Sequence, residues 1–165
     1  MPKYQYGCIR AQIGLMNVTT GAITGLKEID IYQDTIVIDD PEKQMTPHFK
    51  QGDPTPKVTR YARSQMTVAF SIMDTSADSK VEWLGGTKTT VDTKDSWNRP
   101  KTQVNETVKA LIFDLEDGSK ITIPNAGCAA RLASNLNDTD IVVIPVVATV
   151  KSTNLPAVAD VQWTD

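Results

Sequence analysis

Strict alternation of apolar and polar side chains is the sequence feature that most constrains this fold. Between Met66 and Ile72 the large apolar residues occupy every second position, and Thr, Ala and Ser lie between them. A period of two residues is typical of a β-strand that buries one face. The pattern therefore predicts a strand here. Other strands must lie beside it to satisfy its backbone hydrogen bonds.

A short helix is predicted directly after this strand. Thr75 and Asp78 have the spacing of a capping box, so the helix is expected to begin at Thr75. Val81 and Leu84 lie three residues apart and share one face of such a helix. The two glycines at 85–86 supply the positive φ that ends a helix.

The segment 107–123 predicts a β-hairpin, and its apolar pattern decides the turn. A two-residue turn at 117–118 would pair Phe113 with Thr122 and mix the two faces. A three-residue turn at 116–118, with Gly118 in the left-handed region, puts the large apolar residues on one face. Those residues are Leu111, Phe113, Leu115, Ile121 and Ile123. A slip of one residue would expose them, so we predict the three-residue turn with a glycine bulge.

The other strand candidates are less regular. Residues 4–16 and 26–39 alternate in part, and a change of pattern near Gln33-Asp34 indicates either a bulge or a move to a covered environment. Residues 141–151 are β-branched on both faces, which predicts a strand covered on both faces. Pro145 within it indicates a bulge or a sheet edge.

The last third of the chain adds two weaker expectations. Residues 124–137 combine alanines with glycine, serine and asparagine, which favours a strand or an irregular segment over a helix. Residues 152–165 end in Val158, Val161 and Trp163, which suit a last short strand.

Two long stretches show no periodicity and are predicted to be loops. Residues 39–57 contain four prolines together with Met45 and Phe49, which indicates an arm that docks on another surface or folds back on its own domain. His48, the only histidine, has no partner motif and is interpreted as a polar residue of this arm. Residues 87–106 predict a second, peripheral loop.

Composition restricts the class of protein. A chain of 165 residues predicts a single domain, and its net charge of −3 argues against a dedicated nucleic-acid binder. Cys8 and Cys128 lie far apart and are interpreted as small, buried and reduced thiols. The N-terminus has no signal-peptide pattern and no stretch is apolar enough for a membrane helix, so we expect a cytoplasmic origin and no membrane insertion.

Motifs of catalytic or cofactor sites are absent from the sequence. No nucleophile elbow, phosphate-binding loop, zinc-binding helix or dinucleotide fingerprint occurs. We therefore expect no catalytic residue, no cofactor and no metal. The sum of these features is an all-β fold, a sandwich or barrel of about eight strands with one short α-helix and long loops.

The order of these elements resembles the major tail tube proteins of long-tailed bacteriophages. The resemblance covers roughly residues 26–151 and rests on two passages, SIMDTSADSKVEWLGG and the hairpin LIFDLEDGSKITIPNA. It implies stacked rings of six subunits that enclose a continuous inner β-barrel. DNA would pass through this barrel during ejection into the host without specific binding. The partners would be further copies and other tail proteins. The protein would be synthesised in the bacterial cytoplasm and would be located in the virion tail.

The resemblance also suggests roles for particular residues. Candidates for the lumen are the polar faces of two predicted strands: Glu28, Asp30, Asp34, Arg63, Gln65, Thr67 and Ser71. Arg63 departs from an acidic or neutral lining. Candidates for contacts between subunits are Met45, His48 and Phe49 of the arm. An ordinary solvent-exposed face remains the alternative for each of the lumen candidates.

One alternative is a related tube protein, and two come from other classes of protein. The chain would also suit the tube of a contractile injection system. A non-catalytic carbohydrate-binding or adhesin-like β-sandwich is disfavoured by an aromatic content of 6 %. A hydrolase would require paired carboxylates in a cleft with raised pKa values.

Overall fold

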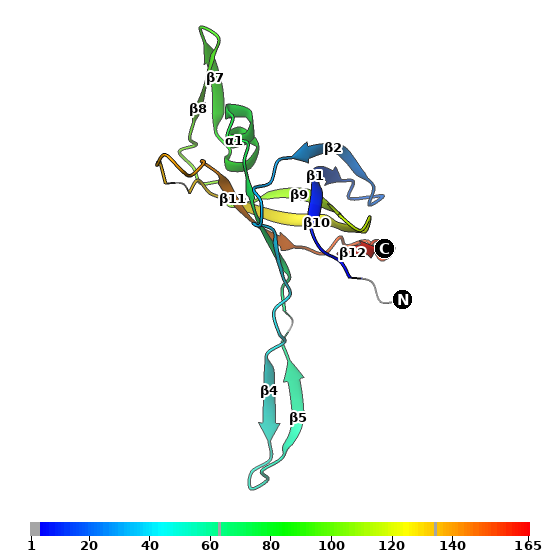
Figure 1. Ribbon diagram of the computed structural model, residues 1–165. Coiled ribbons are helices and arrows are strands. Elements are labelled where there is room, and N and C mark those ends of the chain that lie inside the picture. The colour runs from blue at the N-terminus through cyan, green and yellow to red at the C-terminus, as the bar shows by residue number, and fades with distance from the viewer. Residues whose placement is uncertain (1–3, 63, 134) are drawn as a thin grey trace.

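The computed structural model describes residues 4–62, 64–133 and 135–165, and its main feature is one antiparallel sheet of eight strands (Figure 1). These strands are β1 (Cys8–Met16), β2 (Ile23–Ile29), β3 (Val37–Asp39), β6 (Thr67–Ile72), β9 (Thr107–Leu115), β10 (Lys120–Ala130), β11 (Ile144–Val150) and β12 (Gln162–Thr164). Their order across the sheet is β2-β1-β9-β10-β11-β6-β3, and β12 pairs with β10. The fold is thus mostly β, and β12 confirms the short terminal strand.

The sheet curls until its two edges approach each other at one corner. β2 and β3 lie at opposite ends of the strand order, yet only residues 30–36 connect them. This connection crosses the end of β6, where the Tyr32 N–H donates to the Ser71 carbonyl at 2.8 Å and the Met73 N–H donates to the Asp30 carbonyl at 2.9 Å. The sheet forms no closed barrel within the described ranges, so the barrel alternative is not observed.

The predicted strand over residues 26–39 is wrong, because it is two strands on opposite edges. The chain turns at Asp34, whose φ is 59°. The change of pattern near Gln33-Asp34 therefore marks neither a bulge nor a covered end of one strand. It marks the point at which the chain crosses from one sheet edge to the other.

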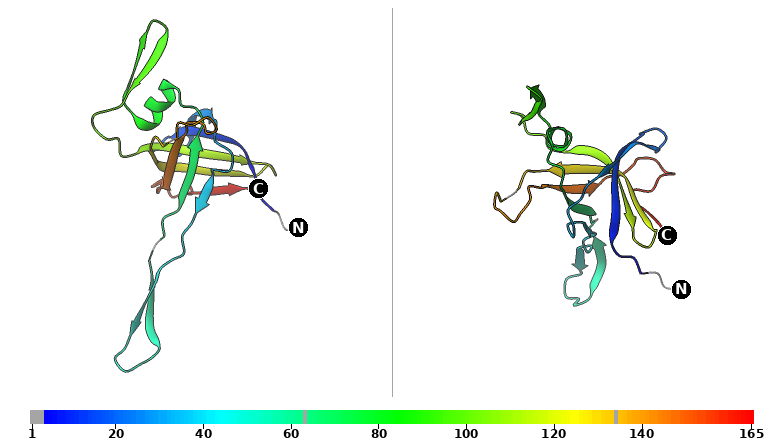
Figure 2. Two further views of the ribbon diagram at one scale, coloured as in Figure 1. Left: turned by 60° about the vertical axis from the view of Figure 1, so that its left-hand side comes forward. Right: turned by 45° about the horizontal axis from the view of Figure 1, so that its top comes forward.

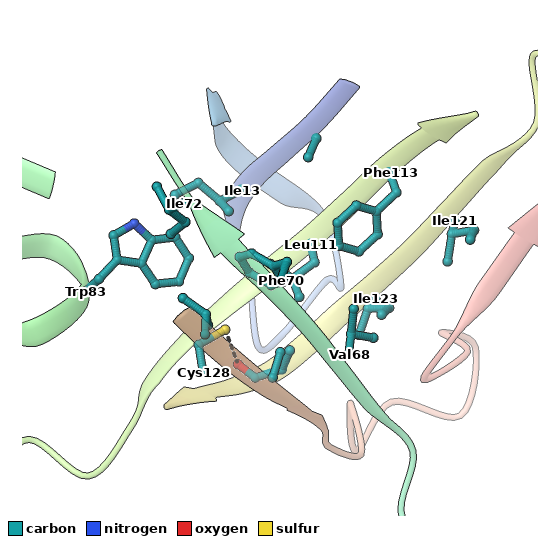
Figure 3. Packing of buried hydrophobic residues seen from close by; sticks show 14 of the residues in the cluster. Ile13, Val68, Phe70, Ile72, Trp83, Leu111, Phe113, Ile121, Ile123 and Cys128 are labelled. Carbon is teal, nitrogen blue, oxygen red and sulfur yellow. Dashed lines mark hydrogen bonds between the residues drawn. The ribbon is translucent and has the colours of Figure 1, made fainter. Parts of the chain in front are cut away.

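The hydrophobic core fills the inside of the curl (Figure 3). β6 contributes Val68, Phe70 and Ile72, each at most 2 % exposed, which confirms the predicted alternation. The Phe70 ring lies between two others in edge-to-face contacts, with centroids 6.1 Å from Trp83 and 6.2 Å from Phe113. Such pairs add to the free energy gained from burying the rings.

The helix α1 (Ala77–Leu84) follows β6 as predicted, but its N-cap differs. The cap is Ser76, whose Oγ accepts from the Ser79 N–H at 3.2 Å, so the predicted start at Thr75 is wrong by one residue. Both residue types make good caps, and the pattern could not separate neighbours. Positive φ values of 73° and 95° at the glycines 85–86 confirm the predicted end.

Trp83 is the residue through which α1 packs against the sheet. It is the buried apolar residue of α1, while Val81 and Leu84 are only half-buried. The predicted apolar face of Val81 and Leu84 therefore omits Trp83, the residue that is most deeply buried. A single large aromatic side chain fixes the helix against Phe70.

The β9–β10 hairpin has the predicted register. Phe113 lies opposite Ile121, and Leu111 lies opposite Ile123. Gly118 has φ 86°, and the N–H of Leu115 donates to the Ser119 carbonyl at 2.9 Å across the turn. The predicted apolar face is buried throughout.

β10 and β11 resolve the weaker expectations. β10 continues through Pro124 to Ala130, with a register shift between Ile123 and Ala126, which agrees with the preference for strand. β11 is central and not an edge, and its pairings show no bulge. Both predictions from Pro145 are therefore wrong, because this proline lies near the strand's beginning, where few ladder bonds are lost.

The prediction that β11 is covered on both faces is also wrong. Ile144, Val146 and Ala148 are buried on the inner face, but Val147 on the outer face is 48 % exposed. The β-branched outer face thus meets no layer of the same chain within the described residues.

Both predicted long loops are hairpins. The predicted stretch 39–57 contains β4 (Met45–Phe49) and the first two residues of β5 (Pro56–Tyr61), which continues beyond it, and the peripheral stretch contains β7 (Thr87–Val91) and β8 (Lys94–Asn98). They project in opposite directions from the sheet (Figure 1). The prolines in residues 39–57 argue against strands in the sequence. In a two-stranded ribbon, however, both strands are edge strands, and edge strands tolerate proline.

Candidate functional site

The β4–β5 hairpin extends away from the rest of the protein (Figure 2). From here on, the arm means residues 43–61, the hairpin itself, in place of the predicted loop 39–57. From residue 39 to residue 62, every side chain except Pro47 is exposed. Among the described residues, its own strand pairing, the bond from the Ala62 N–H to the Gln44 carbonyl at 2.8 Å and the bond from the Ser64 hydroxyl to the Asp40 carboxylate at 3.3 Å hold the ribbon together at this end. An isolated two-stranded hairpin is marginally stable in water, so such a ribbon gains stability from a partner.

The two faces of the arm differ in chemistry. Met45 lies opposite Tyr61 and alternates along β4 with Pro47 and Phe49, so these four residues share one face. Met45, Phe49 and Tyr61 are 56 %, 58 % and 63 % exposed. His48 lies on the opposite face, so the structure separates it from Met45 and Phe49 among the predicted contact residues.

The arm is basic in an acidic protein. Its charged residues are Lys43, Lys50, Lys57 and Arg60 against Asp53. The sum is +3, while the whole chain carries −3. None of the four cations makes an ion pair within the part of the chain that the structure describes.

A cavity of about 1060 Å³ opens where the curl of the sheet is incomplete. We call it the open hollow. Residues 5–11, 28–38 and 115–121 contribute most of its walls. Leu115 and Ile121 of the core line it, together with Ile31, Ile36 and Ile38, which are half-buried and pack against that core. The hydrophobic core thus reaches solvent on this side.

The charged lining of the open hollow is acidic. Its carboxylates are Glu28, Asp30, Asp34, Asp74 and Glu116. Its one cationic side chain, Arg10, already pairs with Asp114 at 2.7 Å. Across the described residues, none of the five carboxylates makes an ion pair.

The predicted lumen residues divide between two surfaces. Glu28, Asp30 and Asp34 line the open hollow. Thr67 and Ser71 are half-buried on the outer face of β6. The remaining two are Gln65, exposed just before β6, and Arg63, which lies outside the described residues. The hydrogen bond from Tyr32 to Ser71 is where the two surfaces adjoin.

The outer face beside Thr67 and Ser71 is an apolar strip. Val37 of β3 and Val147 of β11 flank Ala69 of β6 in the strand register, and both valines are about half exposed. A shallow depression of about 400 Å³ lies here. This strip includes the outer face of β11, which the sequence pattern predicts to be covered.

Sequence reasoning missed Tyr61, Asp74 and Glu116. Tyr61 joins the apolar face of the arm only through the hairpin register, and the other two reach the open hollow only through the curl of the sheet. The alternation of Met45, Pro47 and Phe49 was the one available signal, and the prolines obscured it.

Of the two cysteines, Cys128 is buried as predicted, whereas Cys8 is only half-buried, so the prediction of a buried thiol is wrong there. Burial raises the pKa of the Cys8 thiol above its ordinary value and raises that of Cys128 to about 12, so both thiols stay protonated near neutral pH. No group of three or more His, Cys, Asp or Glu side chains in the described ranges is arranged to hold a metal. Likewise, no described helix has the length and apolar character needed to cross a membrane.

No protein-family model matches the chain, and a search of curated proteins finds no similar sequence.

Proposed function

We propose that this protein is a structural subunit of a phage tail tube, in which stacked hexameric rings form a conduit for DNA during ejection. The observation that carries the proposal is the arm, an exposed amphipathic hairpin that no other described part of its own chain covers. A ribbon with Met45, Phe49 and Tyr61 facing solvent is explained by a protein surface that covers it. The order of elements that resembles tail tube proteins supports the same proposal.

The open edges of the sheet give further support. β2 and β3 end the strand order and leave backbone groups available for pairing with another chain. Ring closure would cover such edges, and a neighbouring copy would also cover the strip at Val37 and Val147.

The proposed lumen requires a surface over which DNA slides. Gln65, Thr67 and Ser71 offer neutral side chains, which would attract no phosphate by counterion release. In this proposal the protein is synthesised in the bacterial cytoplasm and acts in the virion tail, beside other tail proteins and without a cofactor or turnover.

Negative-stain electron microscopy across a concentration series tests the proposal. We expect rings or stacked tubes with a central hole, formed by the purified protein or after addition of tail partners. Dispersed monomers at every concentration, with and without those partners, would contradict it. Copurification with a sheath protein would reassign the subunit to a contractile tail or injection system.

A carbohydrate-binding module is the second candidate, because aromatic side chains line the acidic open hollow. Tyr6, Tyr32 and Trp163 are all at least 43 % exposed there. Such side chains stack on sugar rings, and carboxylates accept from hydroxyl groups. A glycan array with wild type and Trp163→Ala tests this candidate: binding lost in the variant would support it, and no binding by wild type would exclude it.

A further inference from the structure

We propose that the arm of one copy docks in the open hollow of a second copy. The inference rests on the proposed function, since it requires self-assembly, and it names the two surfaces that make the contact. Both surfaces are partly apolar, and their net charges are opposite.

The apolar contact comes first. The arm presents Met45, Phe49 and Tyr61 on one face, and the open hollow presents Ile9, Ile31 and Ile36. The cavity of about 1060 Å³ lies at the top of the range of about 300–1,000 Å³ that small-molecule sites occupy. It is therefore large enough for several side chains of a ribbon. Docking would remove both apolar surfaces from water at once.

The arm and the open hollow carry opposite net charges. The arm sums to +3 over residues 43–61. The open hollow has five carboxylates and one guanidinium, a sum of −4. Because neither these carboxylates nor the arm cations form an ion pair among the described residues, their charges remain available to a second chain. Opposed fields of this kind steer association and fix register.

The occupant cannot be the same chain's arm in this conformation. The arm extends away from the sheet in every view, and its residues are exposed to solvent (Figures 1 and 2). Arm and open hollow are also two different surfaces of one copy. A contact between different surfaces is heterologous, so it propagates into rings or stacks and does not stop at a two-fold dimer.

Charge reversal in matched sets tests the docking. One variant carries Lys43→Glu, Lys50→Glu and Lys57→Glu in the arm, and the other carries Glu28→Lys, Asp30→Lys and Glu116→Lys in the open hollow. Each variant alone should raise the protein concentration needed for assembly by roughly tenfold or more, because like charges then face each other. An equimolar mixture should restore assembly toward the wild-type concentration. Mass photometry and light scattering measure both effects.

A third variant controls for net charge alone. Lys80→Glu, Lys94→Glu and Lys101→Glu change the net charge by the same amount and in the same direction as the arm variant, but outside both surfaces, and should assemble like wild type. All altered side chains except Lys80 are exposed in the monomer, so the urea midpoints of the arm and hollow variants should match wild type.

The outcomes separate the docking from the proposed function. If wild type assembles and the arm variant assembles equally well, or the mixture fails to recover, the docking is wrong and the tube proposal stands. If wild type never assembles, both are wrong. Carbodiimide cross-links between arm lysines and hollow carboxylates of differently isotope-labelled copies would support the docking directly.

Discussion

Gly118 shows how one residue fixes the register of the central hairpin. Its φ of 86° lies in a region that L-residues with a side chain rarely adopt, and a Cβ built there meets no atom within 4 Å. A substitution at this position therefore tests the backbone alone. The turn it permits is what keeps Phe113 opposite Ile121 on the buried face.

Gly118→Ala should lower the free energy of unfolding by about 1 kcal/mol, the cost of a left-handed L-residue. Gly118→Asn should lose less, because asparagine tolerates this conformation better. Urea denaturation of the two variants and wild type measures the difference. Equal losses for alanine and asparagine would show that the cost does not arise from backbone conformation.

At the scale of elements, Glu82 ties the helix α1 to the sheet. Its carboxylate pairs with Lys109 of β9 at 2.9 Å and with Lys27 of β2 at 3.1 Å. Burial alone would raise the pKa of Glu82, but hydrogen bonds from the two lysines outweigh burial and hold it below its usual value. The Nζ of Lys109 also lies 5.9 Å from the ring centroid of Trp83.

Glu82→Gln should lower stability at neutral pH by about 1 kcal/mol, near the upper end for partly exposed ion pairs. Because the folded-state pKa is depressed, this contribution is complete above the ordinary value of 4.5 and is lost as pH falls below it through the depressed pKa. Thermal unfolding at pH 7 and at acid pH should show the difference between variant and wild type shrinking. Glu42→Gln, at an exposed site, should match wild type at both pH values.

For the whole molecule, the buried and exposed aromatic residues have separate tasks. Phe70 fills the core between two other rings, whereas Phe49 faces solvent on the arm. The core therefore stabilises the monomer, and in the proposed function the arm stabilises only the assembly. The same substitution at the two positions distinguishes these effects.

Phe70→Ala should lower the free energy of unfolding by about 3–5 kcal/mol, the usual cost of removing a buried ring. Phe49→Ala should change it by less than about 0.5 kcal/mol, as an exposed substitution does, yet it should reduce assembly. Urea titration and electron microscopy on both variants check the pair. Normal tubes from Phe49→Ala would contradict a role for this ring in assembly.

The sequence by itself determined the elements whose signals are local. The alternation at 66–72, the glycines after Leu84 and the apolar pattern around Gly118 each predicted its element and, for the hairpin, the register. These predictions succeed because period, turn geometry and one buried face depend on residues close in the chain. The functional predictions from the same residues stay proposals.

Only the tertiary structure decided how the sheet curls and what it leaves uncovered. The crossing at Asp34 sends β2 and β3 to opposite edges, so that Glu28 and Glu116 both line one acidic hollow and Val147 stays about half exposed. The arm became a ribbon through pairing across its own turn, despite its prolines. Such features depend on contacts between segments distant in sequence, and on which faces find a partner, so no local period encodes them.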